Sequence, residues 1–312
     1  AGSPSPSQLV GDGATLSDVA AAVQPSVVSI NTGNGEGSGV VYDDEGHIIT
    51  NNHVAATAAG GKMEVAFPDG STAEATLVGA DPAGDLAVIK VEGVDDLTPV
   101  TFGDSESLTV GDQVLALGSP LGLDGSVSAG IVSALDRSIE AGDSGGGDVS
   151  ALSGMIQTDA AINQGNSGGA LVNGRGELIG INTAIATADG SAGSVGVGFA
   201  IPSSTVADTV EQLLEDGSVE NAYLGVGVAD STDEAAGAVV TRVEEGSPAE
   251  EAGLKRGDVI VSVDGEPISA ASDVVAAVQG LEPGAEVEVT YLRDSDEEET
   301  ADVTLGSAVA TD

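Results

Sequence analysis

Short β-rich runs separated by glycine, aspartate and asparagine turns make up the sequence from Val27 to about residue 200, with little helical periodicity. This pattern predicts short strands joined by tight turns. Because strands do not alternate with helices, it favours β-barrels over layered α/β architecture. Aromatic residues make up only 2% of the chain, so valine, isoleucine, leucine and alanine must fill the cores. We therefore expect a mainly β protein, and 312 residues are enough for two or three domains.

The composition is strongly acidic, with a net charge of −43. This charge argues against nucleic acid and anionic membrane surfaces as partners. Like charges at this density destabilise a compact state until salt screens them, so we expect a halophilic protein that loses structure in dilute buffer. The chain has no cysteine and only two histidines, which argues against a disulfide framework and a thiolate or histidine-rich metal site. No cofactor is expected, and no apolar stretch is long enough to span a bilayer.

A serine flanked by glycines, Ser167, lies in the segment GNSGG at 165–169. Glycines let backbone amides approach a reacting carbonyl closely, so Ser167 is a candidate nucleophile. The segment also satisfies the G-x-S-x-G pattern of the nucleophile elbow, in which an acid and then a histidine follow the serine. That alternative fails, because His47 and His53 both precede Ser167. Moreover, Ala170–Ile185 is predicted to form a strand, a turn and a strand where an elbow would begin a helix.

The order histidine, aspartate, serine fits the chymotrypsin arrangement, with His53, Asp85 and Ser167 as its members. Asp85 opens an apolar run that is predicted to be a buried strand, where a carboxylate can fix the imidazole tautomer and stabilise the imidazolium. Each residue also has a simpler explanation: His53 as a packed or surface residue, Asp85 as a turn cap, and Gly168-Gly169 as an ordinary turn. Their occurrence together in this order favours the catalytic interpretation.

Four segments together resemble the HtrA/Deg family of trypsin-like serine proteases. They are TNNHV (50–54), GDLAVIKV (84–91), TDAAINQGNSGGALVN (158–173) and GVGFAIPS (196–203). The resemblance covers residues 16 to 306 and implies a chymotrypsin-like double β-barrel. One barrel would span residues 27 to 100 and the other 110 to 202, with the active site in the cleft between them. The acidic composition indicates a haloarchaeal type of this family.

By this resemblance His53 is the general base, Asp85 the acid that orients it and Ser167 the nucleophile. The backbone amides of Gly165 and Ser167 would form the oxyanion hole. The primary specificity pocket would be formed by side chains near Ile162, Ala184 and Ile185. Since such a lining is apolar, the pocket would accept small or medium apolar side chains and would not attract lysine or arginine.

The second part of the chain resembles a PDZ domain of the kind appended to HtrA/Deg proteases. Its segments are YLGV (223–226), GSPA (246–249), AGL (252–254), RGD (256–258) and VIVSVDG (259–265). The carboxylate-binding residues would be Tyr223, Leu224, Gly225 and Val226. Backbone amides of this loop would bind a peptide's terminal carboxylate, while the peptide adds a strand to the sheet edge. In isolation the same run would be a plain edge strand. Ser272 is expected to cap a helix over 273–279.

Five parts of the chain are expected: a flexible linker at 1–14, a protease domain at 15–202, a linker helix at 203–220, a PDZ domain at 221–306 and a tail at 307–312. Apolar residues at helical spacing predict a helix over Leu16–Val23 that Pro25 ends. A second helix is predicted over Ser204–Glu215, ended by Gly217, as the hinge between domains. The segment Ser138–Ser150, rich in glycine, serine and aspartate, is expected to be a mobile loop, and the resemblance implies a regulatory role.

These features predict an ATP-independent serine endoprotease that degrades misfolded or unfolded proteins, with PDZ recognition of peptide C-termini. The alternative is a non-proteolytic peptide-binding chaperone or scaffold, because the direction of the Gly165 amide depends on backbone conformation. The resemblance implies secretion or attachment to the cell surface, and the first residues look like a linker left after removal of a signal or anchor. No aromatic residue precedes residue 42, whereas family trimers commonly pack aromatic side chains near that end, so a monomer and a homotrimer both stay open.

Overall fold

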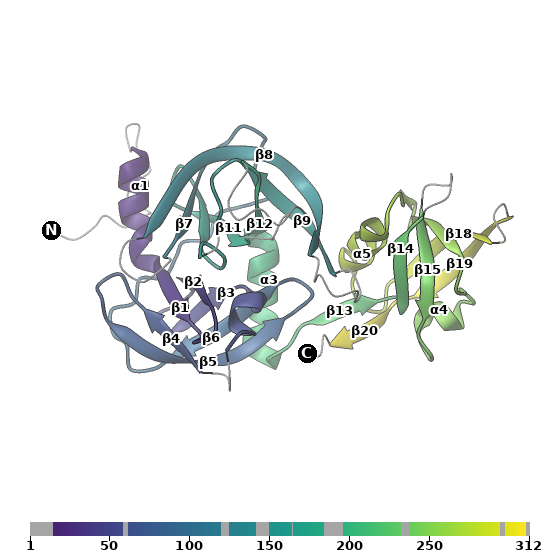
Figure 1. The fold of residues 1–312 in the computed structure, drawn as a ribbon, viewed down its shortest axis with the longest axis horizontal. Helices are drawn as coiled ribbons and strands as arrows, with labels where there is room; N and C mark the ends of the chain where they lie inside the picture. Colours follow the sequence, from purple (N-terminus) through teal and green to yellow (C-terminus); the bar gives the residue numbers. More distant parts are fainter. Residues whose placement is uncertain are drawn as a thin grey trace. The chain divides into compact units, whose positions relative to one another are not determined.

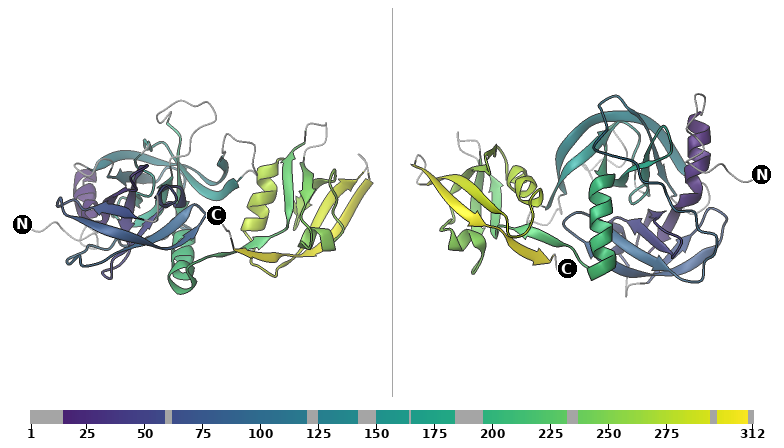
Figure 2. Two further views of the ribbon diagram at one scale, coloured as in Figure 1. Left: turned by 60° about the horizontal axis from the view of Figure 1, so that its bottom comes forward. Right: turned by 180° about the vertical axis from the view of Figure 1, so that it is seen from behind.

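The computed structural model describes residues 15–58, 62–119, 125–141, 150–163, 165–183, 196–231, 237–293 and 297–309. The chain divides into two compact units, Ala1–Arg137 with Gly154–Val219 and Ser138–Ser153 with Glu220–Asp312. Strands dominate both units, and the few helices lie on the outside of the sheets (Figures 1 and 2). The mainly β fold expected from the sequence is therefore confirmed.

A closed, antiparallel barrel of six strands forms the first part of the larger unit (Figure 1). The strands are β1 Val27–Asn31, β2 Glu36–Val41, β3 His47–Thr50, β4 Met63–Ala66, β5 Thr72–Asp81 and β6 Leu86–Val91. They close in the order β1-β2-β3-β6-β5-β4. The interior is aliphatic, with Val28, Ile30, Ile48 and Ile89 fully buried. A Cβ at Gly39 would lie only 2.6 Å from Ile48 Cγ2, so only glycine lets this interior close-pack.

A second closed barrel follows in the same unit. Its strands are β7 Gln113–Gly118, β8 Ser126–Ala141, β9 Ser150–Thr158, β10 Ala170–Asn173, β11 Leu178–Thr183 and β12 Gly198–Pro202. They close in the order β10-β11-β12-β9-β8-β7 around buried Ala116, Leu171 and Ile179. The strands of the two barrels lie within the ranges 27–100 and 110–202 that the family resemblance implies. Ser138–Ser153 belong to the smaller unit, although they fall within the range expected for the protease domain. Residues 142–149 of the expected mobile loop lie outside the described residues.

In the larger unit, capping side chains, a proline and a glycine determine where the helices begin and end. They are α1 Leu16–Val23, the 3-10 turn η2 Gln24–Ser26, α2 Asn52–Ala55 and α3 Ser203–Asp216. Thr15 and Asp18 form a capping box at the start of α1, and Pro25 lies in η2, where the α-helix has ended as predicted. Gly217 ends α3 with a φ of +75°. The expected hinge helix buries Val206 and Leu213 and packs on β5, β6 and β11, so α3 belongs to the larger unit.

The smaller unit is built on one sheet of order β14-β15-β16-β18-β19, with β17 paired to β16 and a separate β13-β20 pair. Its elements are β13 Glu220–Tyr223, β14 Val226–Asp230, β15 Ala238–Val243, α4 Pro248–Glu251, β16 Val259–Val263, β17 Glu266–Pro267, α5 Ala271–Gln279, β18 Glu286–Arg293, β19 Glu297–Thr304 and β20 Gly306–Val309. Val240, Ile260, Val274 and Val289 lie in its core. The expected tail at 307–312 is wrong for 307–309, which pair with β13. Residues 310–312 lie outside the described residues.

Helix α5 begins two residues earlier than expected and is not capped by Ser272. Asp273 Oδ2 accepts from Ser269 N at 2.8 Å and from Ala270 N at 3.0 Å. Asp230 Oδ1, from the end of β14, accepts from Ala271 N at 2.8 Å. The amides that open the helix are therefore bonded to carboxylates, and one of these comes from a distant strand.

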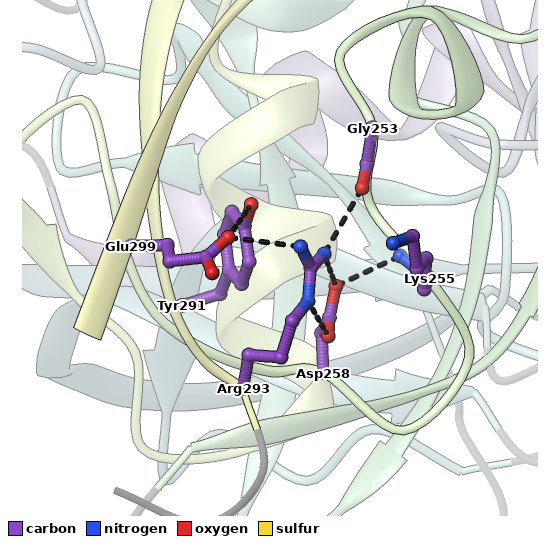
Figure 3. A network of polar contacts seen from close by, with 6 residues as sticks. All are labelled: Gly253, Lys255, Asp258, Tyr291, Arg293 and Glu299. Carbon is purple, nitrogen blue, oxygen red and sulfur yellow. Dashed lines mark hydrogen bonds and ion pairs between the residues drawn. The ribbon is translucent and has the colours of Figure 1, made fainter. Parts of the chain in front are cut away.

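A network centred on Arg293 joins three parts of the smaller unit (Figure 3). The guanidinium makes two bonds to Asp258, at 2.9 and 2.7 Å, and one to Glu299 at 2.8 Å. It also donates to Gly253 O at 3.0 Å and lies over the Tyr291 ring, 4.9 Å from the centroid. Asp258 is only 3% exposed, so Arg293 neutralises a buried carboxylate between β16 and the β18-β19 hairpin. Hydrogen bonding to Asp258 raises the pKa of Arg293 above its usual value.

Candidate active site

Asp85 and the short helix α2 are held together by backbone contacts. The carbonyl of Asp85 accepts from Asn51 Nδ2 at 3.0 Å and from Asn52 N at 3.1 Å. The amide of His53 donates to Asp85 Oδ1 at 3.0 Å. Asp85 itself has a φ of +52°, which a non-glycine residue adopts only when its surroundings hold it there. The turn before β6 is thus fastened to the segment that carries the histidine.

The imidazole of His53 contacts the Asp85 carboxylate directly. Nδ1 lies 3.0 Å from Oδ1 and 2.9 Å from Oδ2. A carboxylate accepts at this position, so Nδ1 carries the proton and Nε2 is left as the basic nitrogen. Thr183 Oγ1, at the end of β11, donates to Asp85 Oδ2 at 2.8 Å. The Asp85 side chain is 13% exposed and that of His53 46%, so the base is accessible while its partner is enclosed.

The other histidine is engaged elsewhere. His47 Nδ1 lies 2.6 Å from Asp43 Oδ2, and His47 Nε2 lies 3.3 Å from Lys90 Nζ. Both ring nitrogens of His47 therefore have partners of their own, and His53 is the histidine that contacts Asp85.

Ser167 lies in a glycine-rich turn that packs against the first barrel. Its carbonyl accepts from Ser38 N at 2.8 Å, and Gly168 N donates to Asn182 O at 2.9 Å. Gly168 has a φ of +80°, and a Cβ there would lie 2.2 Å from Ser38 O and 2.4 Å from Thr50 Oγ1. Only glycine permits this approach. Because Thr50 lies two residues before α2 and Asn182 directly precedes Thr183, the structure brings the three predicted catalytic segments together.

The backbone at Gly165 forms a tight turn. Asn166 N donates to Asn163 O at 2.9 Å, and Gly165 has a φ of +93°. A positive φ at the third position of a β-turn excludes type I. The carbonyl of Gly165 accepts from Ser38 Oγ at 2.6 Å.

Of the expected pocket residues, Ile162 is buried and lies beside β12, where a Cβ at Gly198 would be 2.9 Å from Ile162 Cδ1. Ala184 and Ile185 lie outside the described residues. Sequence reasoning missed two residues that contact the site, Ser38 and Thr183. Ser38 lies between Gly37 and Gly39 and Thr183 ends a buried strand, but neither position carries a pattern that indicates catalysis.

In the predicted carboxylate-binding loop of the smaller unit, two backbone carbonyls are hydrogen-bonded to neighbouring segments. Leu224 O accepts from Ala249 N, and Gly225 O accepts from Glu244 N, both at 3.0 Å. Among the described residues, neither the Leu224 nor the Gly225 amide has a hydrogen-bond acceptor. Tyr223 Oη donates to Glu244, and burial together with this bond raises the pKa of Tyr223 to about 12. Val226 begins β14, which is an edge strand of the sheet.

Comparison with known proteins agrees with this architecture. Residues 37–181 match the trypsin-like peptidase domain and residues 222–305 match the PDZ domain. The solved structure of the HtrA-type protease AlgW with a tripeptide is 36% identical, covers 95% of this chain and 98% of that one, and superposes with a TM-score of 0.72. The chain belongs to the HtrA family of trypsin-like serine proteases. A second solved structure, the serine endoprotease from Yersinia pestis, is 33% identical, covers 96% of this chain and 100% of that one, and has a TM-score of 0.68.

Curated HtrA relatives are longer than this chain. The serine protease PepD of Mycobacterium tuberculosis is 46% identical over 310 residues, which are 94% of this chain and 66% of the relative. The periplasmic serine endoprotease DegP of Escherichia coli K12 is 44% identical over 268 residues, which are 83% of this chain and 54% of the relative. The chain thus spans between half and two thirds of these HtrA proteins.

The described ranges contain neither a candidate metal site nor a candidate membrane-spanning helix. Within them, no group of three or more histidine, aspartate and glutamate side chains is arranged to hold a metal ion. None of the helices there has the length and hydropathy needed to cross a membrane.

Proposed function

We propose that this protein is an ATP-independent serine endoprotease that cleaves unfolded polypeptides through an acyl-enzyme. The observation that carries the proposal is the pair of contacts from His53 Nδ1 to the Asp85 carboxylate, at 2.9 and 3.0 Å. With Nδ1 protonated, Nε2 of His53 takes the proton of the Ser167 hydroxyl as its oxygen attacks the scissile carbonyl. His53 then gives this proton to the leaving amine. Water hydrolyses the resulting ester by the same route.

The oxyanion hole is the second part of the proposal. The amides of Gly165 and Ser167 stabilise the negative oxygen of the tetrahedral intermediate. The +93° φ of Gly165 supports this role, because a type I turn has a negative φ at that position and turns the central peptide over. A non-proteolytic chaperone or scaffold would be compatible with either turn, so the observed backbone favours the enzyme.

The substrate preference follows from the lining of the specificity pocket. Ile162 is buried and packs closely on Gly198, where a Cβ would lie 2.9 Å from Ile162 Cδ1. We propose that the pocket, completed by Ala184 and Ile185, accepts valine, alanine or isoleucine immediately before the cleaved bond. A peptide library cleaved mainly after lysine or arginine would remove this preference.

The PDZ domain is proposed to bind the C-termini of peptides. A peptide would add a strand to β14 and direct its carboxylate to the Leu224 and Gly225 amides, whose carbonyl groups are already bonded within the fold. The solved HtrA-type structures with a tripeptide and a decapeptide support peptide binding in general. A peptide with a free C-terminus should bind, and the same peptide amidated at its C-terminus should bind at least tenfold more weakly, since the amide removes the charge.

The proposal also covers the place of action, the assembly and the solvent conditions of the protein. The relatives named periplasmic support action outside the cytoplasm, whether secreted or at the cell surface. A charge of −43 supports a halophilic protein that does not bind nucleic acid. We keep the homotrimer as a prediction, to be tested by light scattering in molar salt; a monomeric mass would remove it.

The decisive experiment is hydrolysis of casein in molar salt by the wild type and by Ser167→Ala, after circular dichroism has shown both to be folded. Cleavage by the wild type alone supports the protease, and a fluorophosphonate should then label Ser167, as mass spectrometry of the tryptic peptide would reveal. Absence of cleavage by either protein, with suppression of casein aggregation by both, would replace the protease with the scaffold.

A further inference from the structure

Ser38 in β2 reaches across from the first barrel to the turn that carries Ser167. Its hydroxyl donates to Gly165 O at 2.6 Å, and its amide donates to Ser167 O at 2.8 Å. Ser38 is fully buried. One residue therefore holds both residues whose amides make up the proposed oxyanion hole.

The hydroxyl of Ser38 donates one hydrogen bond and accepts another. Ser119 N, just after β7, donates to Ser38 Oγ at 2.8 Å. An incoming N–H occupies an acceptor position, so the hydroxyl proton points to Gly165 O. The carbonyl of Ser38 accepts from Thr50 Oγ1 at 2.7 Å, which fixes the main chain from which the hydroxyl projects. The side chain consequently has one bonded orientation, without solvent to compete for it.

The peptide group between Gly165 and Asn166 is held at both of its ends. Its carbonyl is bonded to Ser38 Oγ, and its N–H donates to Asn163 O at 2.9 Å. Once this plane is fixed, the φ of Gly165, which is +93°, and its ψ together set the direction of the Gly165 amide. Removal of the Ser38 hydroxyl would release the carbonyl end, and glycine imposes little barrier to rotation about φ.

We propose that Ser38 is a positioning residue for the oxyanion hole. It does not touch the substrate; it acts by holding the Gly165 carbonyl so that the Gly165 amide stays directed at the developing negative charge. This inference rests on the proposed protease function and adds to it a residue outside the triad. A hydroxyl that merely contributed to folding would affect stability and leave catalysis by the folded protein unchanged, so the two roles make different predictions.

The test compares Ser38→Ala with a matched control, Ser29→Ala. Ser29 lies directly opposite Ser38 in the β1-β2 pair and is also buried, but none of its described hydrogen bonds reaches the turn at 163–169. Each folded variant is assayed in molar salt for kcat and KM on an apolar fluorogenic peptide. Each is also titrated with a peptidyl boronic acid, whose tetrahedral adduct on the catalytic serine puts an oxygen in the oxyanion hole.

For Ser38→Ala we expect kcat to fall by about 10- to 100-fold and KM to stay within about twofold, because the lost interaction acts on the transition state. The affinity for the boronic acid should fall in proportion to kcat. Ser38→Cys should lie between the wild type and Ser38→Ala, because a thiol is a weaker donor of similar size. Ser29→Ala should keep the wild-type kcat and boronic acid affinity.

Unchanged kcat and boronic acid affinity in Ser38→Ala would overturn the positioning role, whatever the variant's thermal stability. If Ser38→Ala does not fold, Ser38→Cys decides: a lowered kcat supports the role and an unchanged kcat overturns it. A wild type that neither cleaves the peptide nor binds the boronic acid is a different result, since the proposed protease function itself then fails and takes the role of Ser38 with it.

Discussion

Thr183 Oγ1 donates a 2.8 Å hydrogen bond to Asp85 Oδ2, so a residue of the second barrel holds the carboxylate that contacts His53 in the first. Asp85 is also bonded through its carbonyl to Asn51 Nδ2 and Asn52 N. These contacts explain how its left-handed backbone, with a φ of +52°, is maintained. The orientation of His53 thus depends on residues from both barrels.

Thr183→Val should lower kcat without unfolding the protein. Valine has nearly the shape of threonine but cannot donate a hydrogen bond to Asp85. A hydrogen bond to a charged group contributes about 1.5–3 kcal/mol, so its loss should lower the rate roughly tenfold or more. Steady-state hydrolysis of an apolar peptide in molar salt measures the effect. Thr183→Ser keeps the hydroxyl and serves as the control. Equal kcat values for the valine variant and the wild type would contradict the role of this contact.

Arg293→Met should destabilise the PDZ domain by about 3–5 kcal/mol, because it leaves the buried Asp258 carboxylate without its partner. The control is Arg242→Met, which removes a surface pair with Glu244 at a residue whose side chain is 57% exposed and should cost less than about 1 kcal/mol. Urea unfolding followed by circular dichroism in molar salt compares them. Similar losses in the two variants would show that Arg293 is no more important than a surface charge.

Tyr223 should contribute stability that disappears at high pH. Burial and the bond to Glu244 raise its pKa in the folded protein from 10.0 to about 12. A raised pKa means that the folded state favours the neutral phenol, so the contribution is complete below pH 10 and is lost as pH rises toward 12. Thermal unfolding of the wild type and Tyr223→Phe at several pH values tests this. The excess thermal stability of the wild type over Tyr223→Phe should shrink as the pH rises from 10 to about 12. A difference that stays constant with pH would contradict the prediction.

Removal of salt should unfold the protein. With a net charge of −43, like charges repel throughout the chain, and lowering the salt from molar to about 0.01 M lengthens the Debye length from about 3 to about 30 Å. Circular dichroism during stepwise dialysis should show loss of β-structure, and protease activity should fall with it. Full structure and activity in dilute buffer would disprove the halophilic prediction.

Local patterns in the sequence predict much of the fold. The apolar spacing at Leu16–Val23 predicts α1, and that at Ser204–Glu215 predicts α3 to within one residue at each end. Both predictions succeed because one face of each helix is buried, so apolar residues recur at helical spacing in the sequence. The short strands and the glycine-rich turn at 165–169 are local features of the same kind, and the double barrel follows from the family resemblance.

Pairing between distant segments is not visible in such patterns. Residues 307–309 look like a tail, yet they form β20 because β13 offers a strand edge to them. Ser272 looks like a helix cap, yet the amide of Ala271 bonds to Asp230, which lies 41 residues away in the sequence. In both cases the partner is brought near by the rest of the fold, so neighbouring residues carry no sign of it.

The order and surroundings of His53, Asp85 and Ser167 identify them as the candidate triad from the amino-acid chain alone, because the motifs around them are specific and only two histidines are available. The residues that hold the triad emerge only in three dimensions. Ser38 is 127 residues from Gly165, and Asp85 is 98 from Thr183. A hydrogen bond depends on distance and direction in space, and closing two barrels is what brings these groups within reach.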